Sequence, residues 1–93
     1  MKRIELKLDR SLVALAGNPF GRKVFEQQVR TQLDESKEYC IVFPQNVEMV
    51  GSSFVQGFFN YWLQTLGFDG ILQHIQVEAS SEELVKSIFE NLL

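Results

Sequence analysis

The sequence predicts one α/β domain over residues 1–93, a mixed four-stranded sheet packed with about three helices in the order β(β)αβαβα. Two observations carry this prediction. Segments with strand patterns alternate along the chain with segments that have helix patterns, which is the arrangement of βαβ units in a partly parallel sheet. The chain has 93 residues, of which 45% are hydrophobic, so it can fill one core but is too short for two domains.

The first strand is expected near the N-terminus, where apolar residues alternate with charged ones over residues 3–8. This alternation is typical of a half-exposed strand, so we expect an edge or near-edge strand. Residues 12–15, LVAL, fit either a second strand that returns antiparallel or a turn of helix, and we favour the strand. Pro19 disfavours helical geometry at Asn18, and Gly17 permits a turn, so a helix should start after this break.

The first helix is expected over about residues 20–36. Good helix formers surround a narrow apolar stripe there, made by Phe25, Val29 and Leu33 at spacing four. Residues 39–43, YCIVF, are apolar throughout, which is the pattern of a strand covered on both faces. This segment is therefore the best candidate for the central strand of the sheet.

Two further helices flank a last strand. A helix is expected over Ser52–Leu66, with Gly67 as its C-terminal cap. Residues 70–79 are expected to form a strand, and Ser80-Ser81-Glu82-Glu83 matches the capping box that begins a final helix. The inward residues are Ile71, Ile75 and Val77 on the strand, and Leu84, Ile88 and Leu92 on the final helix.

Composition excludes several classes of function. The net charge of -3 and pI near 5.0 argue against binding to nucleic acid, which requires a basic face. A single cysteine, Cys40, cannot form a disulfide within the chain, as expected in a reducing compartment. No apolar run approaches the roughly 18 residues of a membrane span, and the N-terminal residues lack the apolar core of a signal peptide. We therefore expect a cytoplasmic protein that binds neither membrane nor nucleic acid.

No motif in the sequence supports catalysis. Residues 17–23, GNPFGRK, lack the spacing, the lysine and the hydroxyl residue of a phosphate-binding loop. Residues 51–55 resemble a nucleophile elbow only faintly, because Val55 stands where the second glycine is needed. His74 is the only histidine and has no second metal ligand of its kind, and Cys40 lies in the most apolar strand. We therefore expect no enzyme, no cofactor and no metal site.

The expected helix over residues 52–66 is apolar over most of its circumference. Phe54 and Tyr61 fall outside the main apolar stripe, and Gln56, Asn60 and Gln64 form a polar line along it. Two interpretations remain open: the aromatic residues fill the core, or some of them contact another protein. The main stripe consists of Val55, Phe58, Phe59, Trp62, Leu63 and Leu66.

Two serines begin this helix. A serine before a helix accepts a hydrogen bond from an unpaired backbone N–H, and its replacement by alanine costs about 0.5 to 2 kcal/mol. Either Ser52 or Ser53 would serve as this cap. Since one cap is enough, the second hydroxyl is available for another role.

The stretch IVFPQNVEMVGSSFVQGFF, residues 41–59, resembles STAS domains (the sulfate transporter and anti-sigma factor antagonist fold), in particular the uncharacterised bacterial STAS-like families. The resemblance extends over about residues 17–93, and Val47, Ser53 and Phe54 match best. Three departures are visible in the sequence. Gly51 replaces an aspartate, Phe54 replaces a glycine, and Phe43-Pro44 stands where the STAS-like pattern has Asp-Phe.

The resemblance implies a non-catalytic regulatory domain that binds an ATP-binding kinase of the anti-sigma type. In such antagonists a serine at this step is phosphorylated by the kinase, which makes Ser52, with Ser53 beside it, the candidate phosphoacceptor. The expected partner-binding residues are Gly51, Ser52, Ser53, Phe54, Gln56, Gly57, Asn60 and Tyr61.

Two alternatives remain open at this point. One is a small structural or homodimeric assembly module that uses the side of Phe54 and Tyr61, without phosphoregulation. The other is a ligand or nucleotide binder that uses free N–H groups over residues 51–54, because helix N-termini attract anions.

Overall fold

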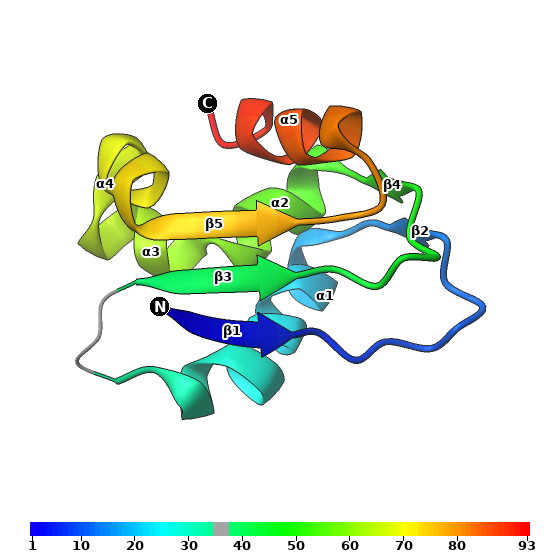
Figure 1. The fold of residues 1–93 in the computed structure, drawn as a ribbon, viewed down its shortest axis with the longest axis horizontal. Helices are drawn as coiled ribbons and strands as arrows, with labels where there is room; N and C mark the ends of the chain where they lie inside the picture. Colours follow the sequence, from blue (N-terminus) through cyan, green and yellow to red (C-terminus); the bar gives the residue numbers. More distant parts are fainter. Residues whose placement is uncertain (35–37) are drawn as a thin grey trace.

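A computed structural model describes residues 1–34 and 38–93 and confirms the α/β class. Strands and helices alternate along the chain (Figure 1). The strands are β1 (Lys2–Glu5), β2 (Ala14–Leu15), β3 (Tyr39–Val42), β4 (Met49–Val50) and β5 (Ile75–Glu78). The helices are α1 (Asn18–Val24), α2 (Ser52–Phe58), α3 (Asn60–Thr65), α4 (Gly67–His74) and α5 (Glu82–Glu90). One π-helical turn, η1 (Phe25–Val29), and one 3₁₀ turn, η2 (Arg30–Gln32), continue α1. No helix among the described residues is long and apolar enough to cross a membrane.

The expected mixed four-stranded sheet is replaced by two parallel sheets. β1, β3 and β5 form a three-stranded parallel sheet with β3 in the centre, which confirms the central and edge positions expected for β3 and β1. β2 pairs in parallel with β4 instead of returning antiparallel to β1. The chain between β1 and β2 runs on past the carboxyl ends of the main strands, where the β2–β4 pair lies (Figure 1). A strand that lies beyond the carboxyl ends of the main strands cannot pair with β1.

Helices cover one face of the three-stranded sheet, with α2 and α3 behind it in Figure 1. Ile4, Ile41 and Val77 are in register across the sheet and are buried on this face. The opposite face carries exposed polar side chains on β1 and β5. β3 itself is buried or half-buried at every position, as expected of a strand covered on both faces.

Cys40 is buried on that opposite face by side chains alone. Arg3 and Glu78, on the two neighbouring strands, form an ion pair of 2.7 Å (Nη1 to Oε2) across it. The thiol donates to the same Glu78 oxygen at 3.6 Å. β3 can therefore be apolar throughout although only one of its faces lies against helices.

Two expected elements differ from the structure. The helix expected over 52–66 is broken at Phe59 (φ -91°, ψ 4°) into α2 and α3. The strand expected over 70–79 is helical up to His74, and only β5 is extended. The buried pair Ile71 and Ile75 caused this error, because a spacing of four matches both the strand period and the helix period. Gly67 has a positive φ of 73°, in agreement with its expected role at a helix C-terminus.

The first helix begins at Asn18, two residues before the expected start at Phe20, with Pro19 in its first turn. Its last turn ends at Gln32, because Leu33 is extended (φ -68°, ψ 135°), so the expected continuation to about Ser36 is wrong. Two stripe residues, Phe25 and Val29, are buried as expected.

α1 crosses α2 in direct backbone contact because a glycine of each helix lies at the crossing. A Cβ at Gly21 would overlap the carbonyl oxygen of Phe54 and lie 2.8 Å from the nitrogen of Phe58. A Cβ at Gly57 would overlap the carbonyl oxygen of Asn18. The helices can take this separation only if both positions lack a side chain.

The final helix begins as expected but with a different capping arrangement. Ser81 is the N-cap, and its hydroxyl accepts a hydrogen bond from the Leu84 N–H at 3.1 Å. The third helical position is therefore a leucine, which cannot reach back as Glu83 would. Ser80 instead donates to the carbonyl oxygen of Val47 at 2.9 Å, which ties the start of α5 to the loop before β4. The three inward residues of α5 and its C-terminal end are buried as expected: Leu84, Ile88 and Leu92.

Candidate functional site

The first turn of α2 presents both serine hydroxyls to solvent. The helix begins one residue earlier than a serine cap requires, because Gly51 is its N-cap and Ser52 its first helical residue. The Gly51 N–H donates to the carbonyl oxygen of Leu15 at 2.8 Å, which fixes the entry of the chain into the helix. The prediction that Ser52 or Ser53 caps the helix is therefore wrong. Among the described residues neither hydroxyl has a hydrogen-bond partner, so both are free to react or to bind.

Two residues expected to meet a partner are instead turned to the inside. Phe54 is fully buried, with its ring edge-on to Phe20 at 5.5 Å and stacked on Phe58 at 6.0 Å between centroids. Its expected place on the outside of the helix, and a dimer surface built on it, are therefore wrong. Gly57 is buried in the crossing with α1.

Gln56 is half-buried and has a structural partner. Its side-chain amide donates to the carbonyl oxygen of Asn91 at 2.6 Å, and the Asn91 amide donates to Val50 at 3.5 Å. These bonds hold the end of α5 against α2 and β4. Gln56 therefore positions the helix rather than offering a free amide to another molecule.

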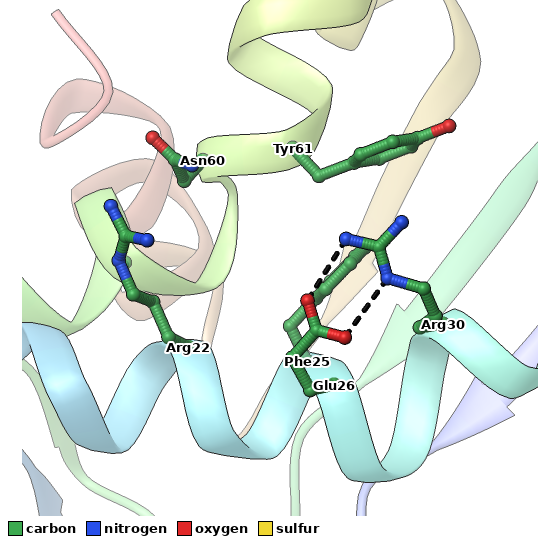
Figure 2. A pocket seen from close by; sticks show the side chains of 7 residues that line it. Arg22, Phe25, Glu26, Arg30, Asn60 and Tyr61 are labelled. Atoms are coloured by element: carbon green, nitrogen blue, oxygen red, sulfur yellow. Dashed lines mark hydrogen bonds and ion pairs between the residues drawn. The ribbon is translucent and has the colours of Figure 1, made fainter.

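Asn60 and Tyr61 line a pocket of about 120 Å³ between α1–η1 and the start of α3 (Figure 2). We call this the arginine pocket. Asn60 faces Arg22 and Tyr61 lies over Arg30, with Glu26 between the two arginines (Figure 2). The lining residues are Arg22, Phe25, Glu26, Arg30, Gly57, Asn60 and Tyr61.

Sequence reasoning found only the α2–α3 half of this pocket. The α1–η1 half follows from a signal that is visible in the sequence, namely charges at spacing four in the order Arg22, Glu26, Arg30. That spacing places the three side chains on one face of a helix. The sequence pattern does not indicate that α1 and α2 cross at two glycines, which brings this face against α3.

One of the two arginines is paired with a carboxylate of the same helical face. Arg30 donates from Nε and Nη2 to both carboxylate oxygens of Glu26, each at 2.9 Å. Its guanidinium carbon lies 4.6 Å from the centre of the Tyr61 ring and 5.4 Å from that of Phe25, within the range of cation–π contacts. The hydrogen bond from Arg30 lowers the pKa of Glu26 below its ordinary value, so this carboxylate is charged at neutral pH.

Exposed apolar side chains lie on β4, which leads into α2, and on the segment before β2. Met49 on β4 is 63% exposed and Val13 before β2 is 48% exposed. The two lie on neighbouring segments, because the N–H groups of Glu48 and Met49 both donate to the carbonyl oxygen of Val13, at 2.7 and 3.2 Å. Since β4 leads through Gly51 directly into α2, these side chains and the free hydroxyls occupy the same end of the molecule.

The described residues hold no cluster of three His, Cys, Asp or Glu side chains that could bind a metal. His74 ends α4 rather than lying on a strand, and its Nδ1 is buried with no partner among the described residues. Burial raises the pKa of the Cys40 thiol, which disfavours the reactive thiolate.

Comparison with known proteins gives no relative from which a function could be transferred: no protein-family model, no curated protein and no solved structure matches the chain.

Proposed function

We propose that this chain is a non-catalytic, STAS-like binding domain of the cytoplasm that docks a protein partner through the end of the molecule where α2 begins. We define this docking surface by Val13, Met49, Ser52 and Ser53. The expected partner is an ATP-binding kinase of the anti-sigma type, as the resemblance of residues 41–59 to STAS domains implies. A protein of this kind regulates by occupying its partner, and needs no catalytic group of its own.

One observation carries the proposal: two exposed apolar side chains lie at the same end of the molecule as two exposed serine hydroxyls that have no hydrogen-bond partner among the described residues. Met49 is the most exposed large apolar side chain outside the chain termini among the described residues. Apolar side chains beside adaptable hydroxyls are typical of protein interfaces, where the apolar contact supplies affinity and the rim supplies hydrogen bonds.

Phosphorylation of Ser52 is the proposed switch. A phosphate adds about -1.5 to -2 charges at neutral pH. The N-terminal turn of a helix carries partial positive charge from its free N–H groups, so it tolerates such a charge without unfolding. The same charge beside Met49 opposes burial of that side chain in an interface. Phosphorylation is therefore expected to release the partner rather than to damage the domain.

Binding to an anti-sigma-type kinase from the same genome, measured by calorimetry, tests the docking surface. Met49→Glu is expected to weaken binding at least tenfold, because it places a charge in the interface. Leu72→Glu is the matched control: Leu72 is 51% exposed on α4, at the opposite end of the molecule from β4 (Figure 1). Equal effects of the two variants, or no effect of Met49→Glu on a complex that does form, would contradict the proposed surface.

Phosphotransfer is tested separately by intact-mass measurement after incubation with the kinase and ATP. One added phosphate is expected on the wild-type chain and none on the Ser52→Ala, Ser53→Ala double variant. The double variant is expected to keep the fold, since neither hydroxyl caps α2. A complex that forms without phosphate transfer would support the binding role but contradict the phosphorylation switch.

A further inference from the structure

Arg22, which lines the arginine pocket, is bonded through only one of its three guanidinium nitrogens among the described residues. Arg22 donates from Nε to the Asn18 side-chain oxygen at 3.0 Å. Its two terminal nitrogens make no hydrogen bond or ion pair with the residues that the structure describes. The bond to Asn18 restrains the guanidinium and leaves its Nη1–Nη2 edge facing the pocket toward Asn60 (Figure 2). This edge has the fork geometry that binds a carboxylate bidentately.

The acidic residue on the same helical face is paired with Arg30 and not with Arg22. Glu26 lies four residues along the same helical face, but both of its oxygens are bound by Arg30. The stacking of Arg30 on the Tyr61 ring holds that pair in place. The charges along this face are therefore positive at Arg22, negative at Glu26 and positive at Arg30. Of the two positive charges, only that of Arg22 has no acidic partner among the described residues.

The charge of the pocket contrasts with that of the chain. Two arginines and one glutamate give its lining a net positive charge of one, whereas the chain carries -3. Asn60 adds a side-chain amide that has no hydrogen-bond partner among the described residues. An anionic group would therefore find a bidentate cation on one side and an amide donor on the other.

From this geometry we propose that the arginine pocket binds one carboxylate, supplied by an acidic side chain of the partner. The inference rests on the proposed function for the source of the carboxylate, but the site itself does not depend on the partner being a kinase. The carboxylate forms a bidentate ion pair with the Nη1–Nη2 edge of Arg22 and accepts a hydrogen bond from the Asn60 amide. The partner thus holds the domain at a second point, beside the crossing of α1 and α2.

Two features of the pocket favour a carboxylate on a short stem. The volume of about 120 Å³ accommodates a carboxylate with a short stem but leaves little room for a larger metabolite. The Phe25 and Tyr61 rings provide an apolar wall for that stem.

Nuclear magnetic resonance titration of the isolated domain tests the site without any partner. The probe is N-acetyl-glutamic acid amide, and the neutral N-acetyl-glutamine amide controls for chemistry at constant ionic strength. Saturable shifts are expected at the Arg22 Nε–H and Asn60 side-chain amide signals, with a dissociation constant on the order of 10 mM for one ion pair in water. Arg22→Gln is expected to weaken binding at least tenfold. Lys23→Gln, which removes the same charge from an exposed neighbour outside the pocket, should leave it within twofold of wild type.

The outcomes are decisive in both directions. Shifts that do not saturate, that follow the neutral probe equally, or that persist in Arg22→Gln would overturn the site. Tighter binding of inorganic phosphate than of the carboxylate probe would overturn the ligand class. Arg22→Lys keeps the charge and loses the fork, so intermediate affinity is expected, and it serves as a second variant if Arg22→Gln affects folding. Because the partner is absent, failure of this titration is distinct from failure of kinase binding.

Discussion

Gly57→Ala tests the backbone crossing on which the arginine pocket depends. The added Cβ would overlap the Asn18 carbonyl oxygen and lie 3.0 and 3.1 Å from the Asn18 carbonyl carbon and Cα. All three atoms are backbone, so no change of rotamer can relieve the contact, and α1 must move away from α2. Overpacking of this kind costs about 1 to 3 kcal/mol and sometimes more. Alanine is more favourable than glycine inside a helix by about 1 kcal/mol, which offsets part of this cost. Because backbone atoms cannot rotate away, we take the upper end of this cost, about 3 kcal/mol, so the net loss is about 2 kcal/mol. This corresponds to a fall in Tm of roughly 8 to 16 °C for a domain of this size.

The measurement is urea unfolding followed by the fluorescence of Trp62, the only tryptophan, which is buried on α3 with its ring edge-on to Phe25. Gly51→Ala is the matched control at the start of the same helix. Its Cβ would have no contact closer than 3.5 Å, and its φ of -72° suits alanine. Loss of a glycine cap should cost less than about 1 kcal/mol. A Gly57→Ala variant as stable as the wild type would refute the tight crossing.

Two further predictions concern capping and charge. Ser81→Ala should lower the free energy of unfolding by about 0.5 to 2 kcal/mol, because it removes the cap of α5, whereas Ser52→Ala should leave it within about 0.5 kcal/mol. Equal losses in chemical denaturation would contradict the assignment of the caps. The hydrogen bond from Arg3 lowers the pKa of Glu78, so this pair stabilises the fold above the unfolded pKa of about 4.3, and the effect is lost as pH falls through the lower folded pKa. The difference in stability between wild type and Glu78→Gln should therefore vanish at acid pH, and a difference that grows there would contradict the ion pair.

Strand and helix patterns predicted most of the main sheet because its positions follow from local apolar spacing. The alternation over residues 3–8 and the apolar run over 39–43 correspond to β1 and β3, at the expected edge and centre. The pairing of the short strands was predicted wrongly, because β2 pairs with β4 and not with β1. The short segments β2 and β4 contain two residues each, and such segments carry no information on which neighbour they join.

Cys40 is buried as expected, and Phe54 is the residue whose burial was misassigned. Cys40 is covered by an ion pair between neighbouring strands, and such cover does not appear in the pattern of its own strand. Phe54 was placed on the outside of a helix with a single apolar stripe. The structure packs α2 against Phe20 on α1 as well as against the sheet, so a second side of the helix is apolar.

The candidate site was predictable only where it lies on one segment. The sequence predicted one free hydroxyl at Ser52 or Ser53, whereas both hydroxyls are free because Gly51 is the cap of α2. The arginine pocket joins residues more than 30 positions apart through the glycine crossing. Helix spacing indicates the Arg22–Arg30 face, but nothing local indicates that Asn60 lies opposite it.

Hydrogen exchange measured by mass spectrometry, with and without an anti-sigma-type kinase, tests the proposed function most directly. The kinase should slow exchange in peptides from β4 and the first turn of α2, and around the arginine pocket in α1. Peptides from β5, an edge strand of the main sheet, should keep their exchange rates. Protection confined to the polar sheet face, or no protection anywhere in a complex that forms, would contradict the account.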